Sequence, residues 1–135
     1  MSNRKTGTTF ERELCERLSD RGFWAHNLAQ NSAGQPFDVL AAKNHTTYPI
    51  DCKVCEHDMF RFSRVEENQR WAMRLWRETG NGESWFALKV SNGSIFMVAF
   101  STIETLECEG KKSLDYGMIE DYGLILERWF KVCGW

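Results

Sequence analysis

Residues 36–53, with the sequence PFDVLAAKNHTTYPIDCK, contain two short runs of alternating side chains on either side of Asn44 and His45. Runs of this length joined by a two-residue turn predict a β-hairpin. When the turn is centred on these two residues, opposed positions have numbers that sum to 89, which places Asp38 directly opposite Asp51. This pairing constrains the fold more than any other feature, because it decides which side chains of the hairpin face a core.

One face of this hairpin is apolar and the other is charged, because successive side chains of a strand alternate between the two faces. Asp38, Asp51 and Lys53 share the charged face. The apolar face consists of Phe37, Val39, Ala41, Ile50, Cys52 and Val54. Pro49 leaves room for a register shifted by one residue, since proline favours edge strands and bulges.

The two opposed aspartates require a physical explanation. Like charges directly opposite each other on a sheet are destabilising, and each carboxylate raises the cost of ionising the other. A divalent cation removes this cost, and Mg²⁺ or Mn²⁺ needs only one or two carboxylates from a protein. Lys53 could then orient a hydroxide or stabilise negative charge on a phosphate. The alternative is a hairpin with one solvated face, whose charges have no chemical role.

The composition fits one globular domain. A chain of 135 residues, 42% of them hydrophobic, is long enough for one core and too short for two. No apolar run approaches the roughly 20 residues of a membrane span, and the N-terminus lacks the apolar region of a secretory signal. Five cysteines at irregular spacing argue for reduced thiols. We therefore expect a single cytoplasmic domain without a membrane segment.

The charge is unevenly distributed along the chain. Residues 1–100 contain 13 basic and 12 acidic side chains, whereas residues 101–135 contain 4 and 7, which together give the net charge of −2. A strongly basic footprint for nucleic acid is therefore absent. Tight non-specific DNA binding is disfavoured, although a dimer could still gather its arginines on one face.

The remaining patterns predict alternating helices and strands. In chain order they are a helix at 8–21, a strand at 23–28, a loop at 30–35, a helix from 63 to 78, a hairpin at 84–100 and a short helix at 101–109. Thr8-x-x-Glu11 and Ser63-x-x-Glu66 are capping-box patterns that would open the two long helices. The alternation favours an α/β domain with a central mixed sheet flanked by helices.

Four parts of the sequence occur in a distinctive order: an acidic first helix (FERELCERL), then GQPFDVL, then IDCK, and then a helix with a glutamine in EENQRW. This order resembles the PD-(D/E)XK nuclease superfamily, and most closely its archaeal and RecU-type Holliday junction resolvases. The resemblance covers about residues 5–100. It implies a restriction-endonuclease-like fold in a single nuclease domain, 1–135, in which 101–135 is a C-terminal extension.

The resemblance also implies the site residues. Lys53 matches the catalytic lysine, and Gln69 matches the residue on the following helix. The implied metal ligands are Asp38, Asp51, Glu11 and the backbone carbonyl of Cys52. Two alternatives stay open: Glu11 could only satisfy a backbone N–H at its helix start, and Gln69 could be a core glutamine with no role in the site.

Several further residues are candidates for DNA contact. They are Ser32 in the loop QNSAGQ and the arginines Arg61, Arg64, Arg70, Arg74 and Arg77. The alternative for the helical arginines is a solvated face with the pairs Glu66–Arg70 and Arg74–Glu78. Phe60 and Phe62 could stack on unpaired bases or anchor the loop, and we favour anchoring.

Cys52-x-x-Cys55 is the only pattern that suggests zinc. A structural zinc site needs four ligands, and no second pair of cysteines or histidines complements these two. We expect plain thiols here.

The predicted function is that of a Mg²⁺-dependent (or Mn²⁺-dependent) endonuclease that hydrolyses DNA phosphodiesters. The resemblance points to four-way junctions as the substrate and to a two-fold homodimer with one site per subunit. One alternative is a restriction-type or repair nuclease of the same fold, which acts on duplex or flapped DNA. The other is a non-catalytic DNA-binding or scaffolding protein, which needs no divalent ion.

Overall fold

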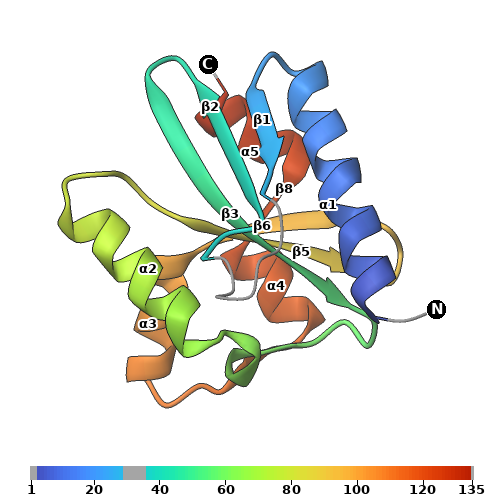
Figure 1. Ribbon diagram of the computed structural model, residues 1–135. Coiled ribbons are helices and arrows are strands. Elements are labelled where there is room, and N and C mark those ends of the chain that lie inside the picture. Colours follow the sequence, from blue (N-terminus) through green and yellow to red (C-terminus); the bar gives the residue numbers. More distant parts are fainter. Residues whose placement is uncertain (1–2, 29–35, 135) are drawn as a thin grey trace.

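A six-stranded mixed sheet forms the centre of the protein, as seen in the computed structural model, which describes residues 3–28 and 36–134 (Figure 1). The strands run in the order β1-β2-β3-β5-β6-β8, and only the pair β3–β5 is parallel. Their bounds are β1 Trp24–Asn27, β2 Val39–Lys43, β3 Thr46–Cys55, β5 Trp85–Val90, β6 Ile95–Ala99 and β8 Leu124–Ile125. The predicted mixed sheet is confirmed.

In the part of the chain that the structure describes, five helices and a small second sheet complete the fold. The helices are α1 Asn3–Asp20, α2 Glu67–Glu78, α3 Phe100–Cys108, α4 Tyr116–Tyr122 and α5 Leu126–Cys133. The second sheet pairs β4 (Phe60–Arg61) with β7 (Ser113–Leu114), and a 3₁₀ turn follows β4 at Phe62–Arg64. Within the described ranges, no helix is long and apolar enough to cross a membrane.

The helices cover both faces of the sheet, which divides the core in two. On one face α1 and α5 pack through Leu14, Leu18 and Trp129. On the other face α2, α3 and α4 pack through Met73, Ile103 and Ile119 (Figure 1). Alternate residues along each strand enter opposite clusters, as the pleat of a sheet requires.

The first hairpin has the predicted register. Val39 pairs with Ile50 and Lys43 with Thr46, so the opposed numbers sum to 89. Asn44 and His45 form the turn with φ of +53° and +68°, the left-handed conformation of a type I′ turn, whose twist matches that of the strands it joins. The register does not slip at Pro49.

One residue of the predicted apolar face lies on the wrong side. Phe37 contacts Trp76 of α2 and belongs to the core cluster opposite to that of Val39. β2 begins only at Val39, so the alternation of a strand does not extend back to residue 37. The other apolar positions of the hairpin pack as predicted.

The first helix begins earlier than predicted. α1 spans Asn3–Asp20, so Thr8 lies inside the helix and the capping box Thr8-x-x-Glu11 is wrong. Glu11 is therefore an interior helical residue and does not cap a helix start. The predicted end of this helix is confirmed, because Gly22 follows it with a φ of +83°.

The second helix begins later than predicted. Ser63 lies in the 3₁₀ turn, and the capping box of α2 is formed by Glu66 and Gln69. The Ser63-x-x-Glu66 prediction is wrong because two overlapping patterns compete here, and glutamate is a less common cap than serine. The spacing of apolar residues also predicts a buried stripe on this helix, consisting of Val65, Gln69, Ala72, Met73 and Trp76. Val65, Gln69 and Met73 are buried, whereas Ala72 and Trp76 are half-buried.

Residues after 100 contribute side chains to the core. β8 pairs with β6, and Trp129 of α5 is fully buried against Phe23 and Trp85. The short helix predicted at 101–109 is confirmed as α3. The later elements escaped prediction because a two-residue strand is too short for a periodic pattern.

The turn conformation leads to a stability prediction. A β-carbon is unfavourable in the left-handed region, so His45→Gly should stabilise the protein by about 0.5–1 kcal/mol. Urea unfolding monitored by tryptophan fluorescence measures this. Gly93→Ala in the second hairpin, where φ is +89°, is the matched control and should destabilise. A His45→Gly variant less stable than the parent would contradict the role of this turn.

Candidate active site

Asp38 and Asp51 meet inside the protein. Asp38 directly precedes β2 and Asp51 lies in β3, and their relative exposures are 8% and 0%. Oδ2 of Asp38 accepts a hydrogen bond of 2.8 Å from the backbone N–H of Cys52. Burial raises the pKa of Asp51 well above its usual range; the charge of Lys53 lowers it, and the charge of Asp38 and a hydrogen bond between the two carboxyl groups raise it.

Lys53 supplies the nearest positive charge. Its Nζ lies 3.2 Å from Oδ2 of Asp51, and its side chain is only 13% exposed. That Asp51 oxygen is buried, and the ammonium group is its charged partner. One ammonium group faces two buried carboxyl groups, those of Asp38 and Asp51, so the ion pair compensates their charge only in part.

Gln69 joins the second helix to this pair. Its Oε1 accepts a hydrogen bond of 3.0 Å from the backbone N–H of Glu66, and its Nε2 donates one of 2.8 Å to Oδ1 of Asp51. The side chain is 7% exposed, so both ends of a buried amide are satisfied. Gln69 is therefore a neighbour of the carboxylates and also a helix cap. The sequence pattern did not reveal Glu66, its partner in the cap.

Glu11 approaches from the first helix. It is half-buried, and burial together with the charge of Asp38 raises its pKa to about 7. Asp38 is thus electrostatically coupled to acids on both sides, one on α1 and one on β3. The structure brings together all five side chains that the sequence pointed to: Glu11, Asp38, Asp51, Lys53 and Gln69.

This donor set suits a hard divalent cation. The described residues contain no cluster of three or more His, Cys, Asp or Glu side chains arranged as a ready metal cage. Mg²⁺ does not require one, because it keeps several waters and takes one or two carboxylates. The adjacent carboxyl groups of Asp38 and Asp51 meet that requirement.

The cysteines near the site behave as plain thiols. All five cysteines are free, and Cys55 is buried in the core. Burial and the charges of Asp38, Asp51 and Glu11 raise the pKa of the Cys52 thiol well above its usual range. Zinc binds thiolates, so this shift makes the Cys52 thiol a weaker ligand, and the absence of a zinc site stays a prediction.

A groove of about 810 Å³ opens beside Lys53; its lining includes Lys53, His57, Arg61 and Arg64, and we call it the Lys53 groove. Arg64 donates a hydrogen bond of 3.0 Å to the carbonyl oxygen of Val54, which fixes its guanidinium at the wall. Arg61 and Arg64, both predicted to contact DNA, therefore line the same groove as Lys53. Ser32, the other candidate outside the helix, lies outside the described residues.

The arginines of α2 bind the neighbouring helix instead. Arg70 makes two hydrogen bonds to Glu107 of α3, of 2.6 and 2.9 Å, and a third to the carbonyl oxygen of Phe62. Arg74 and Arg77 pair with Glu104. The predicted pairs Glu66–Arg70 and Arg74–Glu78 are wrong, since these arginines pair across to α3. Their DNA contact stays a prediction.

Phe60 and Phe62 are both buried, at 0% and 3% exposure, and their rings pack edge to face. This position matches the favoured prediction that they anchor the loop between β3 and α2. Neither ring is presented to a base.

The chain was compared with known proteins. A model described as "Archaeal holliday junction resolvase (hjc)" matches residues 1–129. The chain belongs to this family. Among solved structures, the Hjc Holliday junction resolvase of Archaeoglobus fulgidus superimposes with a TM-score of 0.69 at 23% identity, over 91% of this chain and 98% of that one. A search of curated proteins finds no match.

Family membership decides between the functional alternatives. The resemblance to PD-(D/E)XK resolvases is confirmed, and so are the mixed-sheet fold and the assignment as a Holliday junction resolvase. The match extends to residue 129, well beyond the 5–100 that the motifs alone covered. The C-terminal elements are thus part of the family's fold, in agreement with their burial.

The buried carboxyl groups lead to a pH prediction for the metal-free protein. A pKa raised by folding means that stability is full below the unfolded value, about 4, and falls as pH rises towards the folded value. Asp51→Asn should reduce the loss of stability that accompanies rising pH. The variant should therefore unfold at a higher temperature than the parent protein in EDTA at pH 8. Glu11→Gln should act in the same direction between pH 4.5 and about 7.

Thermal unfolding between pH 4 and 8 measures both effects. Glu16→Gln, which removes an exposed acid of the same helix, is the matched control and should leave the pH dependence of the melting temperature unchanged. An Asp51→Asn variant that melts lower than the parent at pH 8 would show that the carboxylate is stabilising where it lies.

Proposed function

We propose that this chain cleaves four-way DNA junctions with Mg²⁺ or Mn²⁺, using Glu11, Asp38, Asp51, Lys53 and Gln69. The observation that carries the proposal is the pair of buried carboxyl groups, Asp38 and Asp51, with Lys53 Nζ 3.2 Å from Oδ2 of Asp51. One ammonium group compensates two buried carboxylates only in part, and a divalent cation would supply the remaining positive charge. A nuclease also needs the ammonium group beside the cation.

The residues divide the chemical work among them. Asp38, Asp51, the Cys52 carbonyl and Glu11 would hold the ion. When bound, the ion supplies a water of lowered pKa and positive charge for the phosphate. Lys53 orients the attacking water and stabilises the negative charge that develops on the phosphate oxygens. Gln69 fixes the rotamer of Asp51 through Oδ1, and Oδ2 faces Lys53.

The Lys53 groove gives the cleaved strand its path. Arg61 and Arg64 lie along it with Lys53, so the phosphates on one side of the scissile bond meet fixed positive charges. The site itself is acidic and requires cations before a polyanion can approach. This agrees with a chain whose net charge is −2.

A two-fold dimer would supply the second cut of a symmetric pair. Trp71 and Leu75 support the proposal, because they lie one turn apart on α2 with exposures of 64% and 40%. Exposed apolar side chains at such spacing are typical of an interface between subunits. We also propose a cytoplasmic location, since the substrate is cellular DNA and all five thiols are free.

Cleavage assays test the catalytic proposal. Lys53→Ala and Asp38→Ala should each lower the single-turnover cleavage rate of a labelled four-way junction by at least about 100-fold, because each removes a group that acts on the reacting phosphate. Cleavage should also stop in EDTA. Lys89→Ala, which removes a lysine of the neighbouring strand β5 that is paired with Glu13, is the control and should keep the rate.

Flap, linear duplex and single-stranded DNA in the same assay separate a resolvase from a repair nuclease. Unchanged junction cleavage by Lys53→Ala or Asp38→Ala, with folding intact by circular dichroism, would refute the assignment of the site.

Sedimentation tests the dimer. Trp71→Lys combined with Leu75→Lys should shift the wild-type dimer to monomer, because it places charges in an apolar contact. Trp24→Lys, which changes an equally exposed tryptophan on β1, should leave the dimer intact. A parent protein that sediments as a monomer at micromolar concentration would refute the proposal directly.

A further inference from the structure

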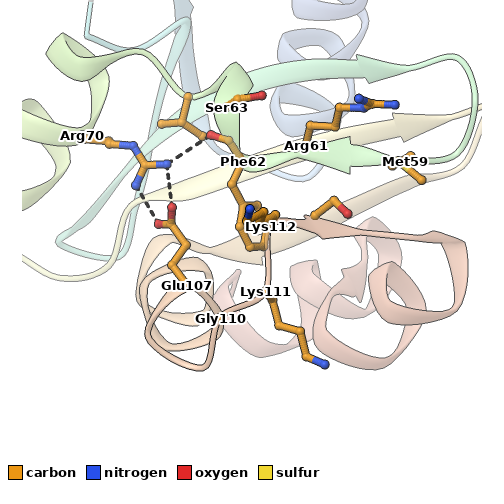
Figure 2. Close-up of a pocket in the computed structure, with 11 residues that line it drawn as sticks. Met59, Arg61, Phe62, Ser63, Arg70, Glu107, Gly110, Lys111 and Lys112 are labelled. Atoms are coloured by element: carbon orange, nitrogen blue, oxygen red, sulfur yellow. Dashed lines mark hydrogen bonds and ion pairs between the residues drawn. The ribbon is translucent and has the colours of Figure 1, made fainter.

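A second pocket lies between the β4 segment and the turn that follows α3, and its role is not explained by the catalytic residues (Figure 2). Its volume is about 760 Å³, and we call it the Lys111 pocket. In Figure 2, Arg61 projects from β4, Lys111 from the turn, and Lys112 lies between them.

The charge of this pocket is strongly positive. Four cationic side chains line it, namely Arg61, Arg70, Lys111 and Lys112, and the single carboxylate among its lining residues is that of Glu107. Arg70 neutralises Glu107 through two hydrogen bonds, drawn as dashed lines in Figure 2. Arg61, Lys111 and Lys112 form no ion pair with the described part of the chain. Three uncompensated charges therefore gather on a protein whose net charge is −2.

The backbone of the pocket is held rigidly. β4 pairs with β7 through Arg61 and Ser113, and the N–H of Phe62 donates to the carbonyl oxygen of Lys112 at 3.0 Å. Gly110 has a φ of +87°, and the N–H of Lys111 donates to the carbonyl of Leu106, which ends α3 and fixes where the lysines emerge. A preformed cationic site binds an anion at a smaller entropic cost than a mobile one.

The pocket is continuous with the Lys53 groove. Met59 and Arg61 line both cavities, so a continuous path runs from Lys53 and Arg64, through Arg61, to the two lysines, and Glu56 and Glu66 also line its groove end. An extended ligand with regularly spaced negative charges can contact all of these cations, whereas a compact anion can contact only a few of them. The phosphates of a nucleic acid strand have this form.

We propose that the Lys111 pocket binds backbone phosphates of the duplex arm that leads away from the cleaved strand. The proposal rests on the proposed function, because the DNA reaches this pocket through the Lys53 groove. Lys111 and Lys112 contact phosphates only, so they contribute to affinity and not to sequence choice. The C-terminal segment thus supplies part of the DNA-binding surface, although it is acidic overall.

Binding measured as a function of salt tests this proposal. In EDTA, where cleavage cannot proceed, the affinity for a fluorescent four-way junction should fall with salt for the parent protein. Lys111→Gln combined with Lys112→Gln should lower the slope of log K against log salt by about 2 and weaken binding roughly tenfold or more at about 0.1 M salt. Arg61→Gln should lower the slope by about 1.

The matched control is Arg128→Gln combined with Lys131→Gln. It removes two exposed positive charges from the same C-terminal segment, on α5 and outside both cavities. It should leave the slope within error of the parent. At saturating protein and with Mg²⁺, the Lys111/Lys112 variant should cleave at the parent rate, because these residues do not touch the reacting phosphate.

Two results would overturn the inference. One is a Lys111/Lys112 variant whose slope of log K against log salt equals that of the parent protein. The other is an equal decrease of that slope in the Arg128/Lys131 control, which would show a general effect of charge. In both cases a parent protein that still cleaves junctions keeps the proposed function. A parent protein that neither binds nor cleaves any of the DNA substrates would refute the proposed function and this inference together. If the Lys111/Lys112 variant lost the same factor of affinity for duplex DNA and for single-stranded DNA, the assignment of the pocket to a duplex arm would be refuted.

Discussion

The opposition of two carboxylates on neighbouring strands is the constraint on which the site depends. The type I′ turn at Asn44 and His45 sets the register, and the register places Asp38 and Asp51 together in the interior. The charge of Asp51 does not favour folding, since burial and the charge of Asp38 favour its protonated form more than the charge of Lys53 opposes it. The burial of Asp51 therefore lowers the stability of the fold. The ion pair with Lys53 and the hydrogen bond from Gln69 offset part of this loss.

Gln69 connects the buried Asp51 to the second helix. One amide closes the first turn of α2 and holds one oxygen of Asp51. A glutamine with only one of these partners would leave a buried polar atom unsatisfied, which is unfavourable in a core. The position of the helix and the rotamer of the carboxylate are therefore set by the same two hydrogen bonds.

The features that sequence predicted well are local. The two hairpins follow from turn residues and alternation within a few positions, and the site motif follows from residues on one of those hairpins. The sequence could not place the start of α2, because Ser63 and Glu66 offer overlapping caps and only tertiary packing chooses between them. The partner of Arg70 was equally hidden, since Glu107 lies 37 residues away.

The crossover between the parallel strands β3 and β5 has a mechanical consequence. The chain passes through α2 on its way from one strand to the other, so this helix is both the connection within the sheet and the support of Asp51. Trp71 and Leu75 lie exposed on the same helix. In the proposed dimer, the partner subunit would press on the helix whose first turn holds Asp51, so assembly would also act on the alignment of the proposed site.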